Sequence, residues 1–597
     1  MKFFSVLLVA VACNVGLTAQ NLSSSLAARR GQLRDALQAE WEYTLRTNPE
    51  FATYIGDNRY NDQLRDYSSE FIAKQIEHNK QQLKVFEAID TTGFPDDEAL
   101  NQQLMVRSLK ESIEGAQFND WQMPVSQFGG PHLGFASMPT QMPFNSAKDY
   151  ENYLSRLHQL PQALDQVTAN MKLGMANQLM PPKYLLEKVA VQAQNIADAS
   201  EDKSPFTQPL AKFPASISAA DQQQLRDAIV KTVKTEVNPG YAKFAAFVKN
   251  EYGPKGRTEM GVWSLPNGAE RYKFDVKRLT TTSMTPEQIH QMGVKQVAEL
   301  DAQMLAIAKQ QGYPDIKNFN EHIRQDLKLH GTSAQQILDL YQHYTDQMYA
   351  KLPQLFGRLP QNKLTVVPME AFRAPDSVPA DYSPGAGDGS RPGRINVNEY
   401  DPEHRLLLNV EAIAYHEGVP GHHLEFSISS ELTDIPPFRK YMFIPAFSEG
   451  WALYSERLGK DVGFYQDPYS EYGRLGNEMW RSIRLVVDTG VHYEHWTRDQ
   501  MVEYFRAHTA MDEPNIQTEV DRYIAWPGQA LSYKLGQMEI LALREQAKKE
   551  LGAKYDIKSF HDEVLSAGPL PLEVLHTRVS AWITGQKSAA GSGAGKP

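Results

Sequence analysis

Residues 416–423 read HEGVPGHH and place three histidines and a glutamate within eight positions of a chain that has 16 histidines. A His-Glu pair followed closely by another histidine is how a helix presents two zinc ligands and a general base. The plain form of this pattern, HExxH, requires a histidine at position 420, where this chain has Pro420. The segment is therefore either a zinc site with altered spacing or only a helix that ends at Pro-Gly.

The spacing of the histidines decides which of them could share an ion. His416 and His422 are six residues apart, about 120° out of phase on an unbroken helix, but Pro420 and Gly421 interrupt the helix. Two residues looped out would restore the geometry of an i, i+4 pair. His423 lies on the face of His416, but about 10 Å further along a straight helix. We therefore expect His416 and His422 to be ligands, and His423 remains the alternative ligand or a group that supports one.

A zinc ion that activates water needs a third protein ligand and one open position. The segment FSEGWALYSE at 447–456 supplies Glu449, 27 residues after His422. Glu456, two helical turns further on, is expected to orient a ligand or to replace one. Glu417 is expected to be the base that takes a proton from the water. The sequence thus predicts one zinc ion per chain.

Composition excludes several other classes of function. The formal net charge of -11 argues against nucleic acid or an anionic membrane surface as the partner. The single cysteine, Cys13, excludes both a disulfide scaffold and a cysteine-ligated metal. No segment after the N-terminus has eighteen consecutive apolar residues, so no transmembrane segment is expected.

The N-terminus has the features of a secretory signal peptide. Lys2 precedes an apolar run from Phe3 to Ala12, and Leu17-Thr18-Ala19 forms a small-residue cleavage site. This predicts export to the periplasm or beyond, with residues 1–19 removed. An alternative interpretation makes Cys13 the site of a lipid anchor.

Hydrophobic periodicity predicts a mainly α protein of two large lobes. The predicted lobes are an N-terminal helical lobe at 20–255 and a catalytic lobe at 256–587, followed by a disordered tail at 588–597. Two short strands, Lys363 to Met369 and Arg394 to Asn398, predict a small sheet beside the metal-binding helix. Helices are expected at 21–47, 149–175, 286–311, 333–352, 403–418, 447–459 and 535–551, and a loop at 261–272.

Five separated blocks carry a resemblance to a known family: HEGVPGHHLEF, FSEGWALYSE, YIAWPGQALSYKLG, DGSRPGRINVN and TTTSMTPEQIHQMG. They resemble the bacterial family catalogued as domain of unknown function 885, a predicted branch of the gluzincin-like metallopeptidases, from about Leu37 to Gly585. The Gly-His step before the second histidine is also similar to the HExGH of angiotensin-converting enzyme. The resemblance implies a zincin-like fold, with His416, His422 and Glu449 as ligands and Glu417 as the base.

The resemblance also implies how a substrate would be held. In such peptidases a strand before the metal-binding helix pairs with extended substrate, which points to Arg394, Asn396 and Asn398 on one edge strand. A Tyr or His donor stabilises the oxyanion, and the candidates, in order, are Tyr523, Tyr533 and His492. Bidentate arginines suit a substrate carboxylate, and the candidates are Arg391, Arg394, Arg481 and Arg484.

The leading hypothesis is an exported zinc peptidase that hydrolyses short peptides. A second hypothesis is a zinc hydrolase of another amide, such as a γ-glutamyl or acyl-amide bond, because the metal chemistry is the same. A third is a catalytically inactive protein that binds peptide, although such a protein would not need Glu417 beside His416. The sequence makes no prediction of the oligomeric state.

Overall fold

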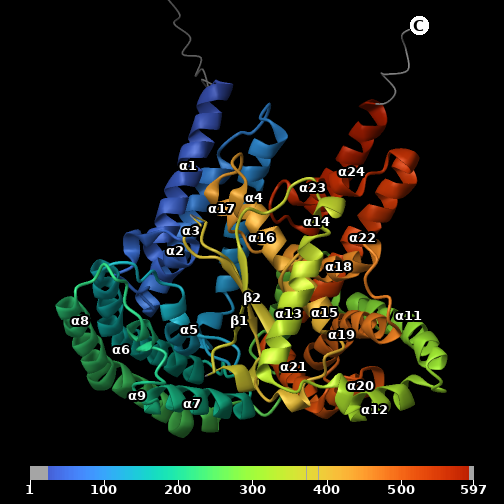
Figure 1. Cartoon of the computed structure of the whole chain (residues 1–597). Helices are drawn as coiled ribbons and strands as arrows, with labels where there is room; N and C mark the ends of the chain where they lie inside the picture. The colour runs from blue at the N-terminus through green and yellow to red at the C-terminus, as the bar shows by residue number, and fades with distance from the viewer. Residues whose placement is uncertain (1–24, 372, 388, 590–597) are drawn as a thin grey trace, which may run out of the picture.

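The computed structural model describes residues 25–371, 373–387 and 389–589, and these are mainly helical with one small sheet (Figure 1). The predicted mainly α class is confirmed. The predicted signal segment and Cys13 lie outside the described residues. The tail predicted from Ser588 begins inside the last helix, which runs to Ala589, and its remaining residues are also outside the described part. Within that part, no helix has the length and apolar content that crossing a membrane requires.

The N-terminal helices form the left side of the molecule in Figure 1, with a core of aromatic and aliphatic residues between Val125 and Tyr252. Their bounds are α1 Leu26–Thr47, α2 Pro49–Ile55, α3 Ser69–Glu87, α4 Asp96–Ala116, α5 Pro131–Ser137, α6 Ala147–Ala176, α7 Lys183–Asp198, α8 Ala219–Thr232 and α9 Asn238–Phe247. The predicted boundary between lobes at residue 255 stays a prediction. Leu100 and Leu104 of α4 pack in the core of the C-terminal half, so the two halves share apolar contacts.

The C-terminal half contains the helices that carry the predicted site. Their bounds are α10 Gly268–Thr280, α11 Pro286–Gln310, α12 Ile316–Gln325, α13 Ala334–Tyr349, α14 Leu352–Leu355, α15 Val410–Glu417, α16 His422–Glu431, α17 Pro437–Lys440, α18 Pro445–Asp461, α19 Pro468–His492, α20 Arg498–His508, α21 Glu513–Ala525, α22 Ser532–Leu551, α23 Ile557–Leu565 and α24 Leu572–Ala589.

Most predicted helices agree with the structure to within a few residues, but two segments differ. The helix expected from residue 403 begins only at Val410, because the chain before it is held extended: Leu407 donates to the Leu329 carbonyl and Leu406 bridges to His330. The loop expected at 261–272 is shorter, since α10 starts at Gly268 and buries Tyr272 in an apolar cluster.

A three-stranded sheet lies between the two halves of the molecule (Figure 1). The strands β1 Leu364–Pro368, β2 Ala380–Ser383 and β3 Gly393–Val397 have the order β1-β3-β2. β3 pairs in parallel with β1 and antiparallel with β2. β2 was not predicted, because its four residues lie between prolines and become a strand only through pairing with β3. Ile395 and Val397 of β3 pack against Ile413 and Ala414 of α15, which positions that helix on the sheet.

Helix α18 lies in the centre of the C-terminal half, and every residue from Ala446 to Glu456 is buried. It contacts α15, α16 and α22. The contact with α22 is close because two glycines face each other: a Cβ built on Gly536 would lie 1.8 Å from the Ala446 carbonyl oxygen and 2.7 Å from Cα of Gly450. This backbone approach determines how near α18 and α22 bring their side chains.

Gly536→Ala is expected to destabilise the protein, because the added methyl group has no room between two helix backbones. Overpacking of this kind costs about 1–3 kcal/mol, so thermal unfolding followed by circular dichroism should show a lower midpoint. Gly585→Ala in α24 is the matched control: nothing lies within 4 Å of its Cβ position, and alanine favours a helix. Equal unfolding midpoints for the two variants would contradict the close approach of α18 and α22.

Candidate functional site

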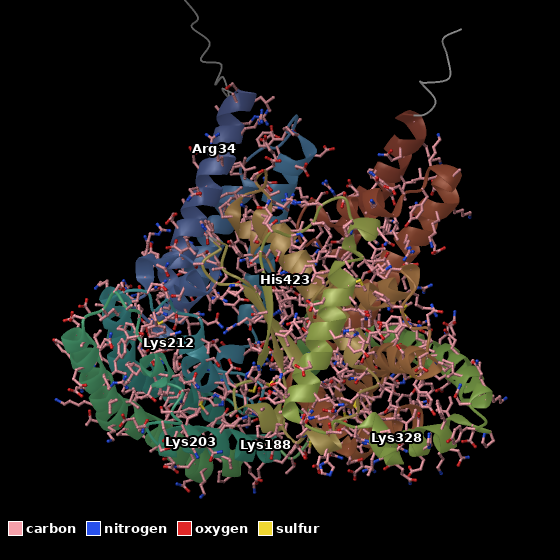
Figure 2. The ribbon with its side chains drawn as sticks, in the orientation of Figure 1. Arg34, Lys188, Lys203, Lys212, Lys328 and His423 are labelled. Carbon is pink, nitrogen blue, oxygen red and sulfur yellow. The ribbon has the colours of Figure 1, made fainter. Side chains whose placement is uncertain are left out.

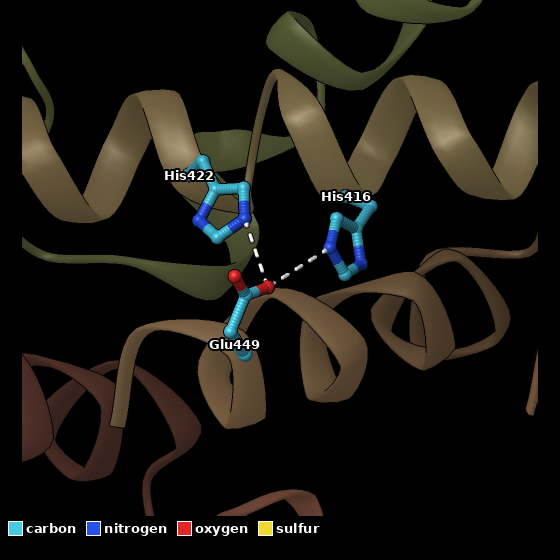
Figure 3. A group of neighbouring side chains, drawn as sticks. All are labelled: His416, His422 and Glu449. Atoms are coloured by element: carbon cyan, nitrogen blue, oxygen red, sulfur yellow. Dashed lines mark ion pairs between the residues drawn. The ribbon is translucent and has the colours of Figure 1, made fainter. Parts of the chain in front are cut away.

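His416, His422 and Glu449 converge in the interior. Their possible ligand atoms all lie within 4.8 Å of one another, and all three side chains are buried. One carboxylate oxygen of Glu449, Oε2, lies 3.7 Å from Nε2 of His416 and 3.4 Å from Nε2 of His422. Figure 3 shows both imidazoles turned toward this oxygen. Two ligands on one tetrahedral zinc, each about 2.1 Å from the ion, are about 3.4 Å apart, so the arrangement has the dimensions of a zinc site.

A complete break between two helices brings the histidines together. α15 ends at Glu417, four residues follow, and α16 begins at His422, whereas the sequence predicted only a bulge. The Gly421 amide donates to the Tyr415 carbonyl at 2.9 Å, which folds the connection back on α15. A Cβ on Gly421 would lie 2.0 Å from the His416 carbonyl oxygen, so glycine is required here.

The helix that supplies the third ligand also holds this break in place. Trp451 of α18 donates from its indole nitrogen to the Pro420 carbonyl at 2.9 Å. Trp451 and Glu449 are two residues apart on α18, so one helix both supports the connection and places the carboxylate. The positions of the three candidate ligands therefore depend on one another.

Glu456 orients one of the imidazoles. Its Oε1 lies 2.8 Å from Nδ1 of His416, and its Oε2 accepts a hydrogen bond from Asn477 at 3.1 Å. A carboxylate behind a histidine fixes the ring and directs the opposite nitrogen, Nε2, toward a metal. The structure thus places Glu456 behind His416 and not among the candidate ligands. Of the two expected roles, orienting a ligand or replacing one, this position fits the first.

The donor set has an unsatisfied oxygen that a cation would satisfy. Among the described residues, Oε2 of Glu449 is buried and has no hydrogen-bond partner. Burial alone would raise the pKa of Glu449, but the two imidazoles that face it hold the pKa well below its usual range. A buried carboxylate that remains ionised between two imidazole nitrogens fits a bound divalent metal of the zinc class.

Glu417 lies beside these three residues without joining them. Its Oε1 is 4.0 Å from Nε2 of His416. Burial raises the pKa of Glu417 to about 8, the nearby Glu449 adds to this effect, and His422 opposes it. A carboxyl group with this pKa can both accept and release a proton near neutral pH.

His423 points away from the three candidate ligands. Its Nδ1 lies 3.0 Å from the Tyr382 hydroxyl and its Nε2 lies 3.1 Å from the Asn362 carbonyl, so both nitrogens are committed to the sheet region. It is fully buried near the middle of the molecule (Figure 2). The structure therefore places His422 at the site and excludes His423 from it.

A cavity of about 460 Å³ opens on the ligands and on Glu417. Its walls come from segments far apart in the sequence. The residues that complete them are Phe51 and Tyr54 of α2, 378–382 and Pro384 around β2, Ile413, Phe426, Tyr441, Phe443, Trp480, Arg481, Arg484, Arg522 and Tyr533. No sequence signal connected α2 to the site, because only tertiary packing brings it there.

Among the oxyanion candidates, only Tyr533 lines this cavity. Its ring stacks toward His416 with centroids 6.1 Å apart. Tyr523 instead donates to Glu519 at 2.5 Å in a buried network, and the two nitrogens of His492 bond backbone groups at 3.0 and 2.9 Å. The expected order, with Tyr523 first, is wrong because α21 turns Tyr523 into the protein core.

The expected substrate-pairing strand is also wrong. β3 is the central strand and its backbone pairs on both sides, so it has no free edge for a peptide. Within the described residues β2 has only β3 as a neighbour, and its residues line the cavity. The edge strand that borders the cavity is therefore β2.

The side chains predicted on β3 and the preceding loop bond to neighbouring parts of the protein. Asn396 donates to Asp381 on β2, and Asn398 donates to three backbone carbonyls. Arg391 donates to two backbone carbonyls, and Arg394 to one. None of these four residues lines the cavity, whereas Arg484, also predicted, does.

Comparisons with known proteins agree with this fold. A family model described as "Bacterial protein of unknown function (DUF885)" matches residues 49–579. A solved structure described as "the putative lipoprotein from Colwellia psychrerythraea" is similar, with a TM-score of 0.86 and 27% identity, over 94% of this chain and 100% of that one. A "putative lipoprotein of unknown function from Shewanella oneidensis" has the same fold, with a TM-score of 0.66 and 17% identity. The match covers 93% of this chain and 99% of that one. No curated protein matches the chain.

Replacing the two adjacent histidines should separate their roles. His422→Ala is expected to remove bound zinc, because it deletes one of three ligands, whereas His423→Gln should retain about one zinc per chain. Elemental analysis of the purified variants checks this, with circular dichroism to confirm folding. Zinc that stays with His422→Ala and is lost from His423→Gln would exclude the ligand set described above.

Zinc binding should release a proton from Glu417. At pH 7 the carboxyl group, with a pKa of about 8, is largely protonated, and a nearby divalent cation favours its anion. Calorimetric titration in buffers of different ionisation enthalpy should therefore show about one more proton released by the native protein than by Glu417→Gln. The difference should disappear at pH well above 8, where Glu417 is already ionised. Equal release at pH 7 would place Glu417 outside the influence of the metal.

Proposed function

The chain belongs to the DUF885 family of bacterial proteins, and we propose that this member is a zinc-dependent hydrolase that cleaves amide bonds of short peptides. The observation that carries the proposal is the convergence of His416, His422 and Glu449 in a cavity that Glu417 also lines. Two imidazoles and one carboxylate are a donor set of catalytic zinc, because three protein ligands leave one position open.

When bound, zinc lowers the pKa of a water molecule and polarises a carbonyl group. In this proposal the Glu417 carboxylate accepts a proton from the water that attacks the amide and later gives it to the leaving nitrogen. Its burial supports this role, because a carboxyl group in an apolar setting can hold the proton between the two steps.

Tyr533 is proposed to donate a hydrogen bond to the oxygen of the cleaved carbonyl. Its hydroxyl oxygen accepts hydrogen bonds from Arg522 at 2.7 Å and from Gln529 at 3.3 Å. Since both neighbours are donors, the proton of the Tyr533 hydroxyl is free to point at a substrate. A donor of this kind stabilises the negative charge that develops on the carbonyl oxygen.

The dimensions of the cavity favour short substrates. Its volume of about 460 Å³ is in the range of small-molecule sites. Helix α2 from the N-terminal half contributes Phe51 and Tyr54 to its walls, so both halves of the molecule border the space that a substrate would occupy. The aromatic walls suit apolar side chains.

We also propose that this activity is exported. The solved structures most relevant to this proposal are of proteins described as putative lipoproteins, and the one at 27% identity is matched over its whole length. Export is the location that the N-terminal sequence pattern predicts.

Glu417→Gln tests the proposal. With zinc loaded to the native level, hydrolysis of a short-peptide library, read by mass spectrometry, should fall by about 10²–10⁴-fold, because a general base contributes a factor of this size. Loss of activity with full zinc content is the expected result.

Glu425→Gln is the matched control. Glu425 is a buried glutamate in α16 that accepts a hydrogen bond from Ser448 and does not line the cavity. Its variant should retain most of the activity. A native, zinc-loaded protein that cleaves no amide in the library, or a Glu417→Gln variant as active as the control, would overturn the proposed function.

A further inference from the structure

Three arginines line the wall of the cavity that contains the candidate zinc ligands: Arg481 and Arg484 of α19, and Arg522 of α21. Burial is nearly complete for Arg481 and Arg484, which are 3% and 1% exposed. Each of the three has a buried side-chain nitrogen without a hydrogen-bond partner among the described residues: Nε of Arg481, Nη1 of Arg484 and Nε of Arg522. Buried guanidinium groups normally use their donors fully, so this wall has unused capacity for an anion.

Arg481 has the weakest set of internal partners. In the described part of the chain its side chain makes one hydrogen bond, to the Asn477 carbonyl at 3.5 Å, and pairs with a carboxylate oxygen of Glu456 3.7 Å away. The guanidinium carbon of Arg481 lies over the Trp480 ring, 4.0 Å from its centroid. An arginine held against an aromatic face can still bind a carboxylate with two parallel hydrogen bonds.

The carboxylates near these arginines are already committed. Glu519 accepts from Arg484 at 2.9 Å and lies 3.6 Å from Arg522. Glu456, the neighbour of Arg481, is bonded to His416 and to Asn477. Since Glu519 serves two arginines and Glu456 is shared between Arg481 and the imidazole, the three arginines outnumber the two carboxylates that pair with them. A bound zinc ion would add positive charge to the cavity.

We propose that Arg481, with Arg484 and Arg522 beside it, binds a carboxylate of the substrate. The carboxylate is assigned to the free C-terminus of a short peptide, so that the proposed hydrolase removes residues from that end. This inference rests on the proposed function of the same site. It adds the substrate class, peptides that end in a free α-carboxylate.

The position of the arginines favours the C-terminus over an acidic side chain. Arg484 bonds to Tyr523 and Glu519, both buried in the packing of α19 and α21. A peptide end that reached Arg484 would meet these packed side chains, which favours a terminal carboxylate at this position. An acidic side chain would instead require the backbone to turn along the wall inside about 460 Å³.

Three peptides on the native, zinc-loaded protein test the inference: Ala-Ala-Phe as the free acid, Ala-Ala-Phe amide, and Ala-Glu-Phe amide. Both hydrolysis and calorimetric binding are measured. Loss of one charge-assisted contact weakens binding by about ten- to hundredfold. The free acid should therefore be bound and cleaved better than Ala-Ala-Phe amide by this factor. Equal binding and cleavage of these two peptides would overturn the inference. If Ala-Glu-Phe amide is bound and cleaved as well as the free acid, the assignment of the bound carboxylate to the C-terminus is overturned.

Variants of Arg481 connect the preference to this residue. Arg481→Gln should reduce the ratio of free acid to amide toward one, mainly through a higher KM, and Arg481→Lys should restore part of the ratio because the charge remains. Arg506→Gln removes an arginine on α20 that pairs with Glu503 and Glu513 outside the cavity, and it should keep the native ratio. A native ratio in Arg481→Gln would overturn the role of Arg481.

The binding measurement separates this inference from the proposed function. If the zinc-loaded protein cleaves none of the peptides but binds the free acid more tightly than the amide, the carboxylate site stands and the hydrolase proposal fails. If it cleaves both peptides equally, the hydrolase proposal stands and the carboxylate site fails. Absence of both cleavage and any difference in binding overturns both.

Discussion

The Glu449 carboxylate lies in the interior, with Nε2 of His416 and of His422 at 3.7 and 3.4 Å from one of its oxygens. Removing a carboxylate from water is costly unless opposite charge or hydrogen bonds compensate it. Here the compensation comes from two helices that the chain break at 418–421 turns toward each other. Trp451 holds this break from the helix that carries Glu449. The central packing of the C-terminal half is therefore arranged around one charged group.

Two further buried carboxyl groups lie next to the imidazole of His416. Glu456 supports His416 from behind, and Glu417 lies 4.0 Å from the same imidazole on the cavity side. Arg481 and Tyr533 line the same cavity. One cavity therefore contains both the candidate metal ligands and the guanidinium groups proposed to bind an anion. The close contact of Gly450 with Gly536 places α22, which carries Tyr533, against α18.

Two expectations about the substrate site were wrong for reasons of topology. Arg394 to Asn398 has the composition of a strand, but composition does not tell whether a strand lies at an edge or in the centre of a sheet. Pairing with β2, four residues between prolines, made β3 central. Tyr523 and Tyr533 lie on either side of the same WPGQA turn, and only the directions of α21 and α22 decide which hydroxyl faces the cavity.

The sequence by itself determined the chemical identity of the candidate site. His416, Glu417, His422, Glu449 and Glu456 were all identifiable, because helix geometry limits which ligands can meet and because metal-binding side chains are few. The mainly helical fold was also predictable, since hydrophobic periodicity is a local property. Only the tertiary structure decided whether His422 or His423 lies beside His416 and Glu449, placed Tyr533 rather than Tyr523 at the cavity, and brought Phe51, Arg481 and Arg522 to the same cavity. Those outcomes depend on contacts between segments far apart in the chain, and no local pattern of residues records which segments will pack together.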